Sequence, residues 1–212
     1  RRQRQMCIRD SMGTLTSAST YIRSLKIPWK ILLPVAFVAF CASAAGAYCA
    51  TILPAHIFRP AIVVVLAAIL VFSVLQPRIP RGQPRALTTS SFLVRGFALG
   101  LILGGYDGIL GAGTGAMMLV ALQIAMGYDM LHATAAAKIL NTATNLGALL
   151  YFIPLGSIHW LLGIAMGCAN MAGSWVGART AIHLGERFIR RVLVIVMTLM
   201  LLRLSAQILG WV

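Results

Sequence analysis

The chain consists of long apolar runs separated by short stretches that collect proline, arginine and lysine. A membrane-spanning helix needs about 20 consecutive apolar residues, and most of the runs reach that length. They lie at residues 31–53, 60–76, 92–126, 133–154, 160–182 and 188–212. The alternation typical of strands is absent from the sequence. The pattern therefore predicts an all-α transmembrane helix bundle in a polytopic membrane protein.

The run at 92–126 is too long for one straight helix and contains a glycine-rich stretch at 104–115. This stretch holds six glycines and Asp107, the only carboxylate deep in an apolar run. Glycine in a helix costs about 1 kcal/mol relative to alanine, which predicts a broken helix. Irregular backbone at membrane depth persists where protein buries it or water lines it. We therefore expect the stretch to form part of a binding or permeation site.

Composition and charge narrow the class of protein further. Charged residues make up only 10% of the chain, against about 25% in soluble domains, and the mean hydropathy is +0.88. The net charge of +14 resides in short basic clusters between the apolar runs, as in cytoplasmic loops. The expected partner is therefore the lipid bilayer and not nucleic acid. The sequence has no HExxH motif, nucleophile elbow, carboxylate pair or Cys/His metal spacing, so we expect no enzymatic activity, cofactor or metal.

Two stretches divide the chain into segments. Residues 1–11, RRQRQMCIRDS, match the translation of a common transposase-type sequencing adaptor, so we leave them out of the fold prediction. The alternative is a genuine basic tail beside the membrane. The stretch at 77–91 is predicted to be a basic cytoplasmic linker between the remainder of a first transmembrane repeat, 12–76, and a second repeat, 92–212. Under this division the first repeat lacks its N-terminal part.

The two repeats are about 130 residues apart and are predicted to be inverted. Matching residues are Tyr21 and Tyr151, Trp29 and Trp160, Gly46 and Gly177, and Arg59 and Arg190. Basic residues cluster early in the first copy and late in the second, at Arg23, Lys26 and Lys30 and at Arg179, Arg187, Arg190 and Arg191. The positive-inside rule places both clusters in the cytoplasm. Opposite orientations of two repeats are common in secondary transporters.

Polar residues recur along one face of the run at 133–154. They are Thr134, Lys138, Asn141 and Asn145, at spacings that place them on the same side of a helix. Lys138 supplies a positive charge and the asparagines supply amide donors, so this face is a candidate anion site. The alternative is that these side chains join helices by hydrogen bonds while Lys138 extends to the membrane edge.

The glycine-rich stretch offers two further candidate groups. The backbone N–H groups of Gly113, Thr114 and Gly115 could open a half-helix toward an anion. Asp107 could pair with Lys138, carry a proton or bind a cation. Alternatively, its carboxylate caps the broken helix.

These residues resemble the TauE/SafE sulfite exporter family of membrane permeases. The resemblance rests on Gly105-Tyr106-Asp107-Gly108 with Gly111-Ala112-Gly113-Thr114-Gly115, and on the run from Ala133 to Asn141 continued by Asn145-Leu146-Gly147-Ala148. It extends over nearly everything from Gly13 onward. It implies two related halves that move small anions, typically sulfite or organosulfonates, across the bacterial inner membrane. It also implies that the residues of 105–115 and the face with Lys138, Asn141 and Asn145 line the pathway.

The leading hypothesis is a secondary transporter for a small oxyanion, working by alternating access around the broken helix. Lys138 is then the main electrostatic attractor for the substrate. Assembly into a homo-oligomer is compatible with the sequence. The alternative is a non-transporting membrane scaffold, or an assembly partner of a membrane complex. A scaffold has no need for a polar helix facing a Gly-rich break.

Overall fold

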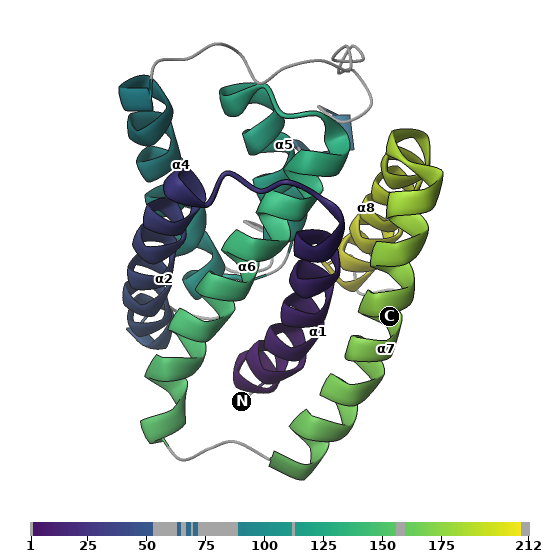
Figure 1. Cartoon of the computed structure of the whole chain (residues 1–212). Helices are drawn as coiled ribbons and strands as arrows, with labels where there is room; N and C mark the ends of the chain where they lie inside the picture. The colour runs from purple at the N-terminus through teal and green to yellow at the C-terminus, as the bar shows by residue number, and fades with distance from the viewer. Residues whose placement is uncertain are drawn as a thin grey trace.

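A computed structural model describes residues 2–52, 63–64, 67–68, 70–71, 89–111, 113–155 and 160–208. All regular structure in these ranges is helical, which confirms the predicted all-α class. In chain order the helices are α1 (Arg2–Ser24), α2 (Trp29–Ile52), α4 (Thr89–Ile109), α5 (Thr114–Met126), α6 (Met130–Phe152), α7 (Trp160–Leu184) and α8 (Glu186–Ile208). A short 3-10 turn, η1 (Ile153–Leu155), follows α6. The long helices form a bundle (Figure 1).

The apolar runs predict most of the helix boundaries to within a few residues, because each helix begins and ends close to the ends of its apolar run. The run at 60–76 and most of the linker at 77–91 lie largely outside the described residues. Helix α1 runs through the predicted adaptor boundary at residue 11. The assignment of residues 1–11 to an adaptor therefore stays a prediction.

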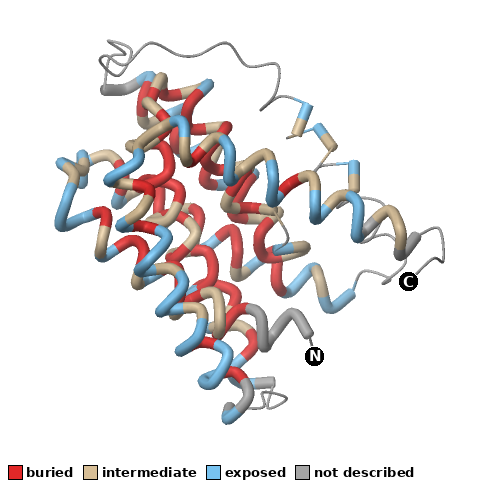
Figure 2. The backbone as a smooth tube through the Cα atoms, turned by 90° about the vertical axis from the view of Figure 1, so that its right-hand side faces the viewer, coloured by how far each residue is buried: buried red, intermediate tan, exposed pale blue. Residues whose placement is uncertain are grey.

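The outer surface of the bundle is apolar in the way a membrane protein requires. Two helical segments of the described chain, α2 and Ser91–Ile109 within α4, are long and apolar enough to cross a membrane, whereas α5 is apolar but shorter. Large apolar side chains such as Phe37, Leu101 and Leu161 are exposed. Figure 2 shows buried residues concentrated along the inside of the bundle and exposed ones on its outer faces. Soluble proteins rarely expose so much contiguous apolar surface.

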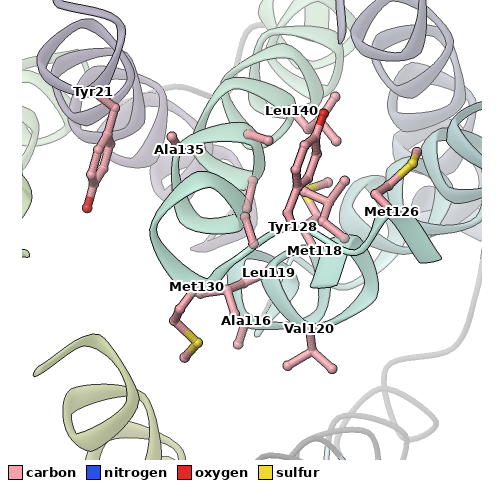
Figure 3. Packing of buried hydrophobic residues seen from close by; sticks show 14 of the residues in the cluster. Tyr21, Ala116, Met118, Leu119, Val120, Met126, Tyr128, Met130, Ala135 and Leu140 are labelled. Carbon is pink, nitrogen blue, oxygen red and sulfur yellow. The ribbon is translucent and has the colours of Figure 1, made fainter. Parts of the chain in front are cut away.

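Helix α6 is the centre of the bundle and packs against α1, α2 and α5. Met118, Leu122 and Met126 of α5 and Leu140 of α6 are almost fully buried. Figure 3 shows Met118, Met126 and Leu140 within this cluster. The core therefore holds α5, the short helix after the break, against the polar helix α6.

Glycines allow α4 to lie directly against α2. A Cβ atom at Gly104 or Gly108 would overlap the backbone of Ala39 or Ser43 in α2. Such close approach of backbones is what small residues provide in membrane helix pairs. For this reason α4 stays helical through Gly108 to Ile109, and the break is narrower than the full glycine-rich stretch at 104–115.

The basic clusters of the two predicted repeats lie at one end of the bundle. Arg23, near the end of α1, and Arg179, near the end of α7, line the same pocket. Figure 1 places the α1–α2 connection, the start of α4 and the α7–α8 junction at this end. We call it the basic end. If both basic clusters face the cytoplasm, they must lie at the same end of the bundle, as they do. The orientation of the bundle in the membrane stays a prediction.

Candidate functional site

The predicted helix break lies between Ile109 and Thr114. Gly111 and Gly113 have positive φ angles of 69° and 80°, a left-handed conformation that favours glycine. The carbonyl of Gly113 then accepts hydrogen bonds from the N–H groups of Ala116 and Met117, at 3.0 and 3.1 Å, and starts α5. The hydroxyl of Thr114 donates to the Gly111 carbonyl at 3.1 Å. Two glycines thus redirect the chain, and the break that the sequence predicts is confirmed.

A cavity of about 380 Å³ lies beside the first turn of α5. Three of the predicted site residues line it: Gly115 of α5 and Thr134 and Lys138 of α6. Helices α1 and α7 add the hydroxyl side chains of Ser17 and Ser174. The remaining wall is mostly apolar and comes largely from α8, through Phe188, Ile189, Val192, Leu193, Val196 and Met197. We call this space the central cavity.

The electrostatics of the central cavity favour an anion. The first N–H groups of a helix have no acceptor within the helix, and they mark the positive end of its dipole. No side chain caps α5 at Gly113. Among the described residues, the ion pairs are Arg9–Asp10 and Asp129–His132, at 2.8 and 2.7 Å, so Lys138 is not paired with a carboxylate. Lys138 and the start of α5 therefore both present positive charge to the same space.

The predicted polar face of α6 divides into two parts. Thr134 and Lys138 line the central cavity, whereas Asn141 and Asn145 do not. The amide of Asn145 donates to the backbone carbonyl and the side-chain oxygen of Asn141, at 2.8 and 3.2 Å. A Cβ atom at Gly115 would lie 3.5 Å from the amide nitrogen of Asn141. Asn141 therefore meets the start of α5, and Asn145 supports it from the next turn.

Asp107 connects three helices beside the break. It is buried, with an exposed fraction of 7%, and the hydroxyls of Thr114 and Thr144 lie within hydrogen-bonding reach of its carboxylate. These contacts join the end of α4 to the start of α5 and to α6. Asp107 and Lys138 do not form an ion pair within the described part of the chain, and no side chain caps the start of α5, so the role of Asp107 stays a prediction.

The remaining predicted site residues do not line the central cavity. Gly108 lies against Ser43 and Ala47 of α2, and Gly111 and Gly113 form the break. A Cβ atom at Gly105 would meet nothing within 4 Å.

The sequence analysis did not identify the cavity residues of α1, α7 and α8. Ser17 is one of many hydroxyl residues of α1, so nothing in the pattern of that helix singles it out. Ser174 lies in a mostly apolar helix, and the cavity residues of α8 are ordinary apolar side chains. The available signal is the predicted repeat, in which the spacing of Tyr21 and Tyr151 makes α1 the counterpart of α6 and so places it at the same centre.

Comparisons with known proteins agree with this picture. The profile described as sulfite exporter TauE/SafE matches residues 7–204. The chain is 31% identical over 195 residues to a Sinorhizobium protein named "Probable membrane transporter protein ORF9", covering 92% of this chain and 74% of that protein. It is 29% identical over 207 residues to a "Probable membrane transporter protein" of Haemophilus influenzae, covering 95% and 78%. No solved structure matches the chain.

A further relative is the "Probable membrane transporter protein YfcA" of Escherichia coli K12, 29% identical over 179 residues, with 81% of this chain and 65% of that protein covered. The family profile spans most of the chain, which confirms the resemblance stated from the motifs. It also confirms the prediction that the chain is a transporter and not an enzyme. The chain belongs to the sulfite exporter TauE/SafE family and is a membrane transporter.

Proposed function

We propose that the chain carries a small oxyanion, of the sulfite or organosulfonate class, across the bacterial inner membrane as a multi-pass secondary transporter. The observation that carries this proposal is the central cavity, in which Lys138 and the first turn of α5 meet. Its volume of about 380 Å³ falls in the range of small-molecule sites, about 300–1,000 Å³. That volume accommodates an organosulfonate as well as sulfite.

In the proposed mechanism each group has a separate role. Lys138 attracts the anion, and the N–H groups at the start of α5 orient its oxygens. The hydroxyls of Ser17 and Ser174 supply further hydrogen bonds from the opposite helices. The wall from α8 is apolar, and electrostatic contacts are stronger next to apolar groups than in water. Gly111 and Gly113 serve as the hinge, since a few residues at helix ends commonly absorb such changes.

The predicted inverted repeat supports alternating access at this centre. The Ser43 hydroxyl of α2 donates to the Thr144 carbonyl of α6 at 2.7 Å. The same spacing that joins Trp29 to Trp160 makes Ser174 of α7 the counterpart of Ser43, and the spacing of Tyr21 and Tyr151 makes α1 the counterpart of α6. A Cβ atom at Gly13 of α1 would lie 2.9 Å from the Ser174 hydroxyl. Ser43 thus lies against α6 and Ser174 against α1, which supports the proposed two-fold relation.

The test is a flux panel in proteoliposomes with sulfite, an organosulfonate and a carboxylate. We expect Lys138→Gln to lower sulfite flux at least about tenfold, because loss of one charge-assisted contact costs more than 1.4 kcal/mol. The control is Lys30→Gln, which removes an exposed lysine at the basic end. Unchanged flux in the Lys138→Gln protein, at equal insertion, would overturn the proposed anion contact.

A further inference from the structure

A second pocket lies at the basic end, between α1 and α7. Its volume is about 400 Å³. Basic, hydroxyl and aromatic side chains surround it: Arg23, Arg179, His183, Thr16, Ser19, Thr20, Ser24 and Trp175, together with Ile182. We propose that this headgroup pocket binds the phosphate of an anionic membrane lipid.

The headgroup pocket is separate from the central cavity. On α1, Ser17 and Tyr21 line the central cavity, whereas Thr20 and Arg23 line the headgroup pocket. The two helices lie in direct contact further along, because a Cβ atom at Gly167 of α7 would overlap Met12 of α1. The pocket therefore lies on the outer face of the α1–α7 pair, away from the proposed substrate path.

The side chains of the pocket suit a phosphate. The Arg179 guanidinium lies over the Trp175 ring, 4.0 Å from its centroid, which holds the plane of the guanidinium in place. A planar guanidinium binds phosphate oxygens through two parallel hydrogen bonds. The ion pairs of the described residues involve neither Arg23 nor Arg179, so no carboxylate neutralises either arginine there.

Hydroxyl groups complete the polar lining. Ser19 and Thr20 both donate to the carbonyl of Thr16, at 2.9 Å. Because the pocket is open, each hydroxyl can turn to a ligand oxygen without leaving a buried group unpaired.

The surroundings favour a lipid over a phosphate free in solution. Apolar side chains next to the pocket in sequence are exposed: Ile22 by 37%, Val176 by 55% and Leu184 by 61%. They offer exposed apolar surface for acyl chains near the same ends of α1 and α7 as the charged groups. Basic pockets between membrane helices on the cytoplasmic side bind acidic lipid headgroups, and the basic end is the predicted cytoplasmic side.

Native mass spectrometry of the purified protein in detergent tests the assignment. The probes are palmitoyl-oleoyl phosphatidylglycerol, the matching phosphatidylcholine and inorganic phosphate. We expect phosphatidylglycerol to bind at least about tenfold more tightly than phosphatidylcholine, because each basic residue near a membrane surface contributes about 1 kcal/mol. The double variant R23Q/R179Q should lose this preference.

A matched control removes the same charge at the same end. R187Q/R191Q takes two exposed arginines from α8 outside the pocket and should keep the lipid preference. Retained preference in R23Q/R179Q, or equal loss in the control, would overturn the pocket. Displacement of the lipid by an equal concentration of inorganic phosphate would overturn the lipid assignment. If R23Q/R179Q fails to fold, the single variant R23Q is measured in its place, because it leaves the Arg179–Trp175 contact intact.

Discussion

At the scale of single residues, Asp107 illustrates how a carboxylate can be placed at membrane depth for a structural reason. Its neighbours are two threonine hydroxyls and not a cation, and they belong to different helices. A buried carboxylate needs donors, because an isolated charge in an apolar medium is very costly. The hydroxyls of Thr114 and Thr144 interact with this carboxylate, and each also donates to a backbone carbonyl, that of Gly111 or that of Asn141. We therefore propose that Asp107 helps to hold the start of α5 beside the central cavity.

We expect Asp107→Ala to lower the free energy of unfolding by about 1–3 kcal/mol, because both hydroxyls lose their interaction with the buried carboxylate. Asp107→Asn should recover most of the loss, since the amide oxygen still accepts. Thermal unfolding in detergent measures both changes. Thr180→Val is the control, because that hydroxyl bonds only within its own helix, to the Val176 carbonyl at 2.8 Å. Full stability of Asp107→Ala would contradict a clasp between the helices.

At the scale of elements, the glycines at 104–115 have two different structural roles, which the sequence alone does not distinguish. Gly104 and Gly108 serve close packing on α2, whereas Gly111 and Gly113 serve the turn. The apolar runs predict where the helices lie because lipid thickness sets their length. They do not predict which neighbour each glycine meets, since that depends on contacts far apart in sequence. The break is for this reason shorter than its glycine content indicates.

Gly108→Ala and Gly105→Ala form a matched pair for this distinction. Gly108→Ala should destabilise the protein by about 1–3 kcal/mol, because the new methyl group overlaps the α2 backbone. Gly105→Ala should be neutral or stabilising by up to about 1 kcal/mol, because its Cβ enters open space and alanine favours the helix. Unfolding temperatures of the two proteins check this order. Equal temperatures would contradict the direct α2–α4 contact.

The part of the candidate site that lies on α6 could be predicted from the sequence. Thr134 and Lys138 are one turn apart, so a helical period suffices to place them together. Gly115 could also be predicted as a site residue, because it lies at the start of the helix after the break and helix starts bind anions. The contributions of α1, α7 and α8 depend on how helices pack around α6. Ser17 and Phe188 carry no local pattern that marks them as cavity residues.

At the scale of the whole molecule, the basic clusters of the two predicted repeats lie at the same end of the bundle, and this makes the membrane topology testable. In a cysteine-free background, single cysteines replace the exposed residues Lys26, Arg187 and Ile153. The first two should react with an impermeant maleimide from the cytoplasmic side only, because both lie at the basic end. Ile153, beyond the far end of α6, should react from the other side. Labelling of Lys26 and Arg187 from opposite sides would contradict the bundle.

The walls of the central cavity are bare backbone at Gly115 and Gly177. A Cβ atom at Gly177 would meet nothing within 4 Å. Under the proposed function, the absence of side chains at these two positions leaves room for the cargo beside the α8 side chains that form most of the wall. Such a wall makes substrate range adjustable in small steps, because each added carbon narrows the space while Lys138 and the start of α5 keep their charge. Members of one fold could thus sort anions by bulk without changing how they recognise an anion.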